Sequence, residues 1–187
     1  MPKPKIAVMY FPGNNCEEET KDRCIDVGME AKIVRWNSKE NLSDFDGYII
    51  PGGFSYEDRI RAGVIAATEK IMNAVREEVK SGKPLLGLCN GAQILVETGL
   101  IPGLKNGVQM ALAPNINPFV SGYYNAWVYI KAINSKNNAF NQLYEKNEII
   151  KIPVAHGEGR FKTKDSKLIK QLEKNKQITF KYCDEKG

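Results

Sequence analysis

Cys89 is the residue of this 187-residue chain whose neighbours most clearly favour chemistry. It is the centre of Gly87-Leu88-Cys89-Asn90-Gly91, which lies between a predicted strand and a predicted helix. Glycines on both sides allow the sharp turn of a nucleophile elbow, which holds the central side chain out above a sheet. The helix N-terminus favours a thiolate, and the Asn90 N–H points to where an oxyanion would form. Cys89 is therefore a candidate nucleophile. The alternative is a buried cysteine in a turn whose glycines serve packing alone.

A second motif, Pro51-Gly52-Gly53, ends another predicted strand. Consecutive glycines leave backbone N–H groups accessible, because no side chain stands in the way. An oxyanion hole needs a second donor of this kind, and Gly53 is our candidate. Pro-Gly-Gly on its own is also typical of a plain turn, so its pairing with the elbow carries the interpretation.

The third motif contains His156, the only histidine of the chain, followed by Glu158. A cysteine hydrolase commonly uses a histidine to accept the thiol proton and to protonate the leaving amine, and a neighbouring carboxylate can orient the ring. His156 and Glu158 are therefore a candidate base and its orienting group. A glycine-rich loop that presents polar groups to a ligand or partner is the alternative, and the spacing alone does not choose between the two.

The elements that must position these residues alternate strands with amphipathic segments, the pattern of a parallel sheet with crossover helices. The sequence predicts an α/β fold: an open, mostly parallel sheet with helices on both faces. Strands are expected at Ile6–Tyr10, Ala31–Trp36, Tyr48–Ile50 and Pro84–Leu88, and helices at Cys16–Val27, 62–80 and Gly91–Glu97. Ligands of such sheets bind outside the carboxyl ends of the strands, where the elbow and the Pro-Gly-Gly motif fall.

The second half of the chain is richer in Gly, Asn and Pro and predicts an added β-rich C-terminal portion. Isolated strands are expected at Val108–Leu112, Ala126–Ile133, Glu148–Val154 and Ile178–Tyr182. No repeat or linker marks a boundary, and the length suits a single domain. We therefore expect residues 1–187 to form one domain.

Composition and charge exclude several classes of protein. A hydrophobic fraction of 42% and a charged fraction of 26% are typical of a globular protein. The net charge of +5 arises between residues 131 and 187, where lysines alternate with acids as on a solvated helix face, so we expect no nucleic-acid partner. The absence of a long apolar stretch predicts no membrane segment and a cytoplasmic location. The spacing of the four cysteines does not suggest a metal site.

Together these motifs resemble the class I, or triad, glutamine amidotransferases, whose flavodoxin-like fold carries the nucleophile in a G-x-C-x-G-x-Q motif that here spans Gly87 to Gln93. Longer segments narrow the resemblance to the glutaminase of formylglycinamide ribonucleotide amidotransferases. These segments are Phe11-Pro12-Gly13-Asn14-Asn15-Cys16, Gly52-Gly53-Phe54-Ser55-Tyr56-Glu57-Asp58, Arg61-Ala62-Gly63 and Ala155-His156-Gly157-Glu158-Gly159-Arg160-Phe161.

The resemblance implies hydrolysis of glutamine through a cysteine thioester and transfer of ammonia to a synthetase subunit. Carried over by position, Cys89 is the nucleophile, Gly53 and Asn90 supply the oxyanion N–H groups, and Phe54 and Gln93 lie near the glutamine. The synthetase activates formylglycinamide ribonucleotide with ATP, and a small third subunit often joins the complex. Because this chain lacks a phosphate-binding loop, it is expected to need no cofactor itself, with ATP and magnesium on the synthetase.

The chain departs from the family pattern in two ways. Glu57 stands where the family usually has glycine, and the family's catalytic His-Pro-Glu element would follow the segment matching Tyr182–Gly187. The resemblance therefore implies that this domain lacks its C-terminal end, or that His156 substitutes, or that hydrolysis is impaired. An amidotransferase with another acceptor and a non-catalytic regulatory module of the same fold are the alternative functions.

Overall fold

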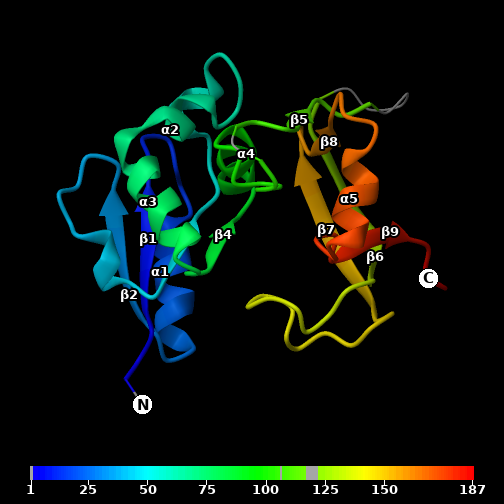
Figure 1. The fold of residues 1–187 in the computed structure, drawn as a ribbon, viewed down its shortest axis with the longest axis horizontal. Helices are drawn as coiled ribbons and strands as arrows, with labels where there is room; N and C mark the ends of the chain where they lie inside the picture. Colours follow the sequence, from blue (N-terminus) through cyan, green and yellow to red (C-terminus); the bar gives the residue numbers. More distant parts are fainter. Residues whose placement is uncertain (1, 106, 117–121) are drawn as a thin grey trace. The chain divides into compact units, whose positions relative to one another are not determined.

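The computed structural model describes residues 2–105, 107–116 and 122–187 and shows two compact units (Figure 1). Unit 1 is Met1–Val108 and unit 2 is Gln109–Gly187. Unit 1 contains the predicted parallel sheet, and unit 2 contains the added strands. The prediction of one domain over residues 1–187 stays a prediction.

The sheet of unit 1 has four parallel strands in the order β2-β1-β3-β4. Its strands are β1 (Lys5–Tyr10), β2 (Glu30–Arg35), β3 (Gly47–Ile50) and β4 (Leu85–Gly87). Each strand was predicted to within two residues, because short β-branched runs end at recognisable turns. The parallel arrangement brings the carboxyl ends of β1, β3 and β4 to the same edge of the sheet.

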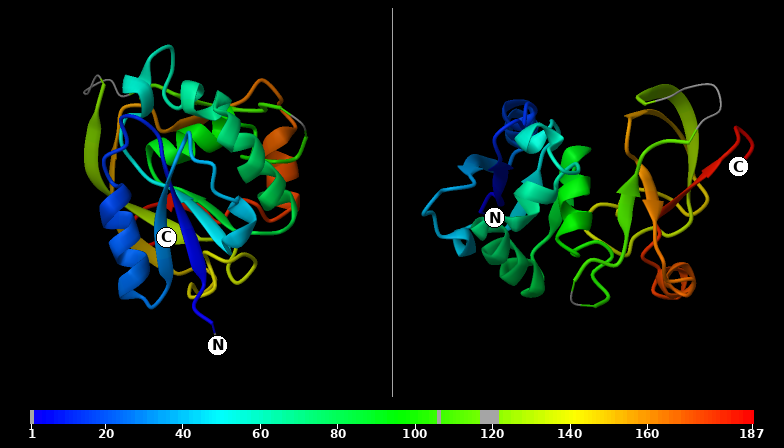
Figure 2. Two further views of the ribbon diagram at one scale, coloured as in Figure 1. Left: turned by 90° about the vertical axis from the view of Figure 1, so that its left-hand side faces the viewer. Right: turned by 90° about the horizontal axis from the view of Figure 1, so that it is seen from above.

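Helices cover both faces of this sheet, as predicted (Figure 2). Along β1, Ala7 and Met9 join the main core cluster, whereas Ile6 and Val8 are buried on the opposite face because successive strand residues alternate. Helix α1 (Glu17–Asp26) contacts β1 and β2. Because both faces of β1 are buried, its sequence is apolar almost throughout.

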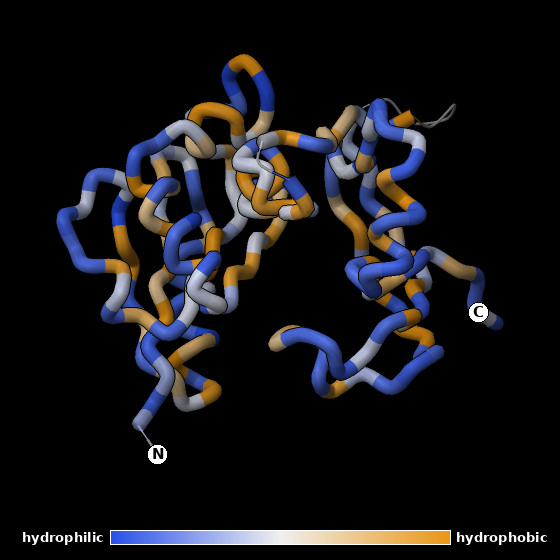
Figure 3. Tube along the Cα trace, viewed as in Figure 1, coloured by the Kyte–Doolittle hydropathy of each residue, from blue (hydrophilic) through white to orange (hydrophobic). Residues whose placement is uncertain are grey.

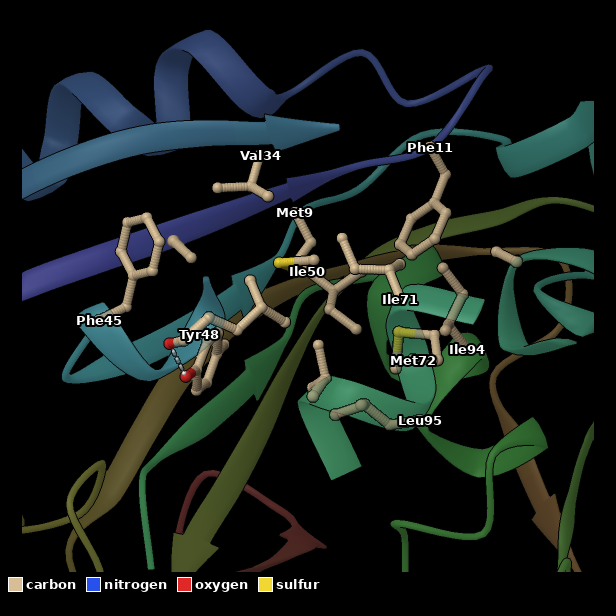
Figure 4. Close-up of a cluster of buried hydrophobic side chains, with 14 residues drawn as sticks. Met9, Phe11, Val34, Phe45, Tyr48, Ile50, Ile71, Met72, Ile94 and Leu95 are labelled. Carbon is tan, nitrogen blue, oxygen red and sulfur yellow. Dashed lines mark hydrogen bonds between the residues drawn. The ribbon is translucent and has the colours of Figure 1, made fainter. Parts of the chain in front are cut away.

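The main core cluster lies between the sheet and helices α3 (Lys70–Lys80) and α4 (Asn90–Glu97) (Figure 4). Figure 4 shows one hydrogen bond within the cluster. The Tyr48 hydroxyl donates to the Leu42 carbonyl at 2.6 Å. Burying one large apolar side chain contributes about 1.5–3 kcal/mol, so this cluster fixes the sheet edge on which the elbow depends. Its fully buried members include Met9, Phe11, Val34, Ile50, Met72 and Ile94.

The prediction of one helix over residues 62–80 was wrong. The segment forms α2 (Val64–Thr68) and α3, separated by the extended backbone of Glu69. Helix α2 packs on α4 and on the 3-10 turn η2 (Ser55–Asp58). Helix α3 packs on the 3-10 turn η1 (Leu42–Asp44), so one straight helix could not make both sets of contacts. The Tyr56 hydroxyl donates to the Glu69 carboxylate, and burial, followed by this hydrogen bond, raises the pKa of Tyr56.

Unit 2 is built on antiparallel strands, which agrees with the predicted β-rich portion. Strands β7 (Ile149–His156), β6 (Tyr124–Ala132) and β9 (Phe180–Cys183) pair in that order, and β5 (Ala111–Ala113) pairs with β8. Strand β8 (Arg160–Lys162) was not predicted, because it follows glycines in a segment interpreted as a loop. Helix α5 (Leu168–Lys174) carries two of the lysines of the C-terminal third, Lys170 and Lys174. Long connections of unit 2 are hydrophilic (Figure 3).

Candidate active site

Cys89 occupies a strained turn between β4 and α4. Its backbone angles are φ 53° and ψ −110°, a conformation that residues other than glycine rarely adopt. Such strain costs on the order of 1–3 kcal/mol and persists only where the surrounding structure enforces it. The sharp strand-to-helix turn predicted from the sequence is therefore present, and its cysteine is exposed.

Close packing explains both glycines of the elbow. A Cβ atom on Gly91 would lie 2.0 Å from the Ile50 carbonyl oxygen, and one on Gly87 would lie 2.7 Å from the Gly91 backbone. Both distances are too short for any side chain, so the elbow can approach β3 only with glycine at these positions. The packing role that the sequence left as an alternative is thus real, and it also holds Cys89 in place.

Two backbone donors near Cys89 are unpaired. Among the described residues, neither the Gly53 N–H nor the Asn90 N–H donates a hydrogen bond. Asn90 is the first residue of α4, where N–H groups have no partner within the helix. The Pro-Gly-Gly loop lies against the elbow, since a Cβ on Gly52 would be 3.4 Å from the Cys89 Cβ. Both predicted oxyanion donors are therefore available for a ligand.

The Asn90 side chain ties the elbow to the loop that follows Gly53. It is fully buried, and its Oδ1 accepts the Ser55 N–H at 3.0 Å. Its Nδ2 donates to the Asp58 carboxylate at 3.1 Å and to the Gln93 Oε1 at 2.9 Å. Sequence reasoning singled out only the backbone of Asn90. Its side-chain role was not predictable because its partners are 32 and 35 residues away.

A third segment, the loop after β1, holds the Pro-Gly-Gly motif from the other side. Asn14 is buried, accepts the Phe11 N–H at 2.7 Å and donates to the Gly52 carbonyl at 3.3 Å. The Asn15 N–H also donates to that carbonyl, and the Phe54 N–H donates to the Gly13 carbonyl at 2.8 Å. Sequence reasoning missed this contribution. The signal that could have found it is the position of the segment after a parallel strand.

The structure brings most of the predicted site residues together in unit 1. Phe54, at the start of η2, is 58% exposed, and Gln93 is half-buried on α4. Phe54 is exposed, whereas Gln93 Oε1 accepts a hydrogen bond from Asn90 Nδ2. Their predicted contact with glutamine stays a prediction.

The candidate base His156 and its neighbour Glu158 belong to unit 2. His156 ends β7, and its Nδ1 is buried without a hydrogen-bond partner in the part of the chain that the structure describes. A Cβ on Gly159 would lie 2.5 Å from the imidazole, so the ring covers that glycine. The orienting role predicted for Glu158 and the catalytic role predicted for His156 stay predictions.

Residues 2–105, 107–116 and 122–187 contain no cluster of three or more His, Cys, Asp or Glu side chains that could hold a metal ion. The same residues form no helix long and apolar enough to cross a lipid bilayer.

Comparisons with known proteins agree with this geometry. Residues 3–187 match the CobB/CobQ-like glutamine amidotransferase domain. The phosphoribosylformylglycinamidine synthase subunit PurQ of Methanothrix thermoacetophila is 46% identical, with 98% of this chain and 72% of the relative covered. That of Pyrococcus furiosus is 42% identical, with 98% and 73% covered. The solved structure of PurLQS from Thermotoga maritima matches with a TM-score of 0.79 at 31% identity, over 98% of this chain and 76% of that one. The chain therefore belongs to the CobB/CobQ-like glutamine amidotransferase family and, within it, groups with the PurQ subunits of phosphoribosylformylglycinamidine synthase.

Proposed function

We propose that this chain hydrolyses glutamine at Cys89 and supplies the ammonia to a synthetase subunit. That subunit converts formylglycinamide ribonucleotide to formylglycinamidine ribonucleotide in purine biosynthesis. The observation that carries the proposal is the strained Cys89 elbow beside two unpaired backbone donors. Membership of the PurQ group supports the choice of acceptor over other amidotransferase reactions.

The proposed mechanism begins when the Cys89 sulfur attacks the carboxamide carbon of glutamine. The negative charge that forms on the carboxamide oxygen is stabilised by the Gly53 and Asn90 N–H groups, which need no reorganisation if the loop is already in place. Collapse of this intermediate expels ammonia and leaves a glutamyl thioester on Cys89. Water then hydrolyses the thioester to glutamate and restores the thiol.

Selective labelling tests the nucleophile. A glutamine analogue that carries an electrophilic carbon should modify Cys89 and spare Cys16, Cys24 and Cys183, with peptide mass spectrometry as the readout. Cys24 is buried and Cys183 half-buried, so Cys16 is the exposed internal control. Excess glutamine should protect Cys89. Equal labelling of Cys16 and Cys89 would show general thiol reactivity and count against the assignment.

Expulsion of ammonia requires a proton donor, and we propose that His156 is not that donor. Its imidazole covers Gly159, and its Nδ1 is enclosed, which suits a structural role in the turn between β7 and β8. His156→Ala in the full polypeptide should therefore retain glutaminase activity within about fivefold, because general acid–base groups contribute far more, typically 10²–10⁴-fold. A loss in that larger range, with the fold intact by circular dichroism, would assign the base to His156.

The partners are proposed on the same basis: a synthetase subunit that binds ATP and magnesium, and a small third subunit. The solved Thermotoga maritima structure is titled PurLQS, which supports a multisubunit assembly. Because release of free ammonia is wasteful, we expect slow glutamine hydrolysis by the isolated polypeptide and acceleration when the synthetase binds. The check is glutamate production with and without the synthetase. Fast turnover that the synthetase does not change would argue against this coupling.

A further inference from the structure

Cys16 lies at the same edge of unit 1 as Cys89, although the two are far apart in sequence. A Cβ on Gly52 would lie 3.4 Å from the Cys89 Cβ and 3.7 Å from the Cys16 sulfur. Atoms of both cysteine side chains therefore lie within 4 Å of the position that a side chain on Gly52 would occupy. Both cysteines are exposed and neither is engaged in a disulfide.

The backbone fixes Cys16 in this position. The Asn15 N–H donates to the Gly52 carbonyl at 3.3 Å, and Asn14 forms an antiparallel bridge with Gly53. On the other side of Cys16, its carbonyl accepts the Thr20 N–H at 3.1 Å at the start of α1. Cys16 is thus held between the Pro-Gly-Gly loop and a helix, so its proximity to Cys89 does not depend on a free loop.

Burial and nearby charges lower the reactivity of the Cys16 thiol. Burial, followed by the charges of Glu19, Cys89 and Glu17, raises the pKa of the Cys16 thiol. A thiol with a raised pKa is a poor nucleophile at neutral pH and competes weakly for glutamine or for an oxidant. An oxidant therefore reacts slowly with Cys16, and the attack of Cys16 on an oxidised Cys89 depends on the proximity of the two side chains.

We propose that Cys16 is a resolving cysteine, which forms a reversible disulfide with Cys89 when a hydroperoxide oxidises the active site. This inference rests on the proposed role of Cys89 as the exposed nucleophile. In the first step the Cys89 sulfur attacks one peroxide oxygen, the O–O bond breaks, and Cys89 sulfenic acid and one water form. In the second step the Cys16 sulfur attacks the Cys89 sulfur, the S–O bond breaks, and the hydroxyl leaves as a second water.

The overall change oxidises two thiols to one disulfide and reduces one hydrogen peroxide to two waters. The disulfide removes the sulfur that attacks glutamine, so ammonia production stops. It also protects Cys89 from further oxidation to sulfinic acid, which a dithiol cannot reverse. A dithiol reductant restores both thiols and activity.

The experiment treats the full polypeptide with hydrogen peroxide and maps its disulfides by peptide mass spectrometry. We expect a cross-linked peptide pair containing Cys16 and Cys89, with loss of two hydrogens and restoration by dithiothreitol. Cys16→Ser should fold, lose the cross-link, and accumulate Cys89 sulfinic acid instead, so that at least tenfold less activity returns with dithiothreitol. Cys183→Ser, which alters a cysteine of unit 2, should behave like the unchanged chain.

Gly52→Ala is a second variant that tests the geometry itself. The added methyl group meets ordinary contact distances, so it should be tolerated, but it stands against both the Cys89 Cβ and the Cys16 sulfur. We expect disulfide formation to slow at least tenfold in this variant. The proposal is overturned if oxidation leaves Cys89 as sulfinic acid in the unchanged chain, or joins Cys89 to another cysteine. Because the cross-link is mapped by mass, this result does not depend on whether the chain hydrolyses glutamine.

Discussion

The two units of the chain bury very different amounts of apolar surface. Unit 1 places helices on both faces of a parallel sheet, and its core includes fully buried aromatic and aliphatic side chains. In the described part of unit 2 the buried apolar residues are Ala132, Leu168 and Leu172. Its sheet leaves Trp127 66% exposed and Tyr182 69% exposed. Unit 1 therefore has the more rigid scaffold.

This difference bears on how the strained turn at Cys89 is held. The backbone of Cys89 is costly to hold, and it is held by the close approach of Gly91 to β3 and by a dense hydrogen-bond network around Asn90. Strain of this kind persists only where the surrounding structure enforces it. The candidate nucleophile Cys89 thus lies in the unit with the larger core.

The largest expected effect contrasts one cysteine from each unit. Cys89→Ser should reduce glutamine hydrolysis on the order of 10⁴-fold or more, because a serine hydroxyl without an adjacent base is a far weaker nucleophile than a thiolate. Cys183→Ser in unit 2 should change the rate less than twofold. Both are measured as glutamate released in the presence of the synthetase. A comparable loss for the two variants would remove the functional contrast between the units.

The next prediction compares how much stability is lost when one buried side chain is truncated in each unit. Met72→Ala in α3 should lower the free energy of unfolding by about 3 kcal/mol, because it loses burial and leaves a cavity that a tight core does not refill. Leu168→Ala in α5 should cost less, about 2 kcal/mol, because the sparse core around it can collapse into the space. Urea unfolding followed by circular dichroism gives both values.

The tryptophans allow this test to resolve the units separately. Trp36 packs against the core of unit 1 and Trp127 lies on the sheet of unit 2, so single-tryptophan variants report on each unit. If residues 1–187 form one domain, as the sequence predicts, both tryptophans should follow one transition that either alanine substitution shifts. Separate midpoints would establish two independently unfolding domains.

A smaller effect contrasts two buried asparagines. Asn90→Ala removes the hydrogen bonds to Ser55, Asp58 and Gln93. The loop that carries Gly53 should then move, and the rate of glutamine hydrolysis should fall about 10²-fold. Asn141 of unit 2 is equally enclosed and accepts the N–H groups of Asn137 and Asn138. Asn141→Ala should destabilise unit 2 by roughly 1–3 kcal/mol while leaving the rate unchanged.

Protein stability must be measured alongside these rates. Asn90→Ala should reduce kcat much more than it raises KM, because in the proposed mechanism the Gly53 loop stabilises charge that develops during the reaction and does not contribute to ground-state binding. A rise in KM alone, or a rate loss that disappears at low temperature where the variant is fully folded, would indicate a general structural role for Asn90.

Sequence patterns predicted the parts of the molecule that depend on local signals. The strands of unit 1 follow apolar runs, and the elbow depends on Gly87 and Gly91, whose spacing is readable without any tertiary information. The helix boundary at Glu69 was missed, since no proline or glycine marks it and its cause is packing of α2 and α3 on different elements. Tertiary contacts override local helix propensity at such positions.

Motifs singled out Cys89, Gly53 and the Asn90 backbone as site candidates, and their catalytic roles stay predictions. Asn14 and the Asn90 side chain bind partners distant in sequence, which no motif shows. The proximity of Cys16 to Cys89 likewise arises only when β1 and β4 share an edge of one sheet. Long-range pairing of this kind has no signature in a single sequence.

The smallest expected effect compares strained residues of the two units. Glu57, beside the site, has φ 57°, and Lys176, after α5 in unit 2, also has φ 57°. A left-handed conformation costs a residue with a side chain about 1–2 kcal/mol, whereas glycine adopts it freely but loses more entropy on folding. Glu57→Gly and Lys176→Gly should each stabilise the chain by about 0.5–1 kcal/mol. The exposed ion pair of Glu57 with Arg59 contributes little against this gain.

The alanine variants at these positions are the matched controls, because alanine removes the side chain but keeps the strain. Glu57→Ala and Lys176→Ala should therefore leave the free energy of unfolding within about 0.5 kcal/mol of the unchanged chain. Tyr56 and Asp58, which flank Glu57, also have positive φ, so relief at Glu57 acts within a continuously strained turn. If Glu57→Gly stabilises the chain without altering the glutaminase rate, the turn is a structural support. If the rate falls while stability rises, the strain at Glu57 is used to position the loop that carries Gly53.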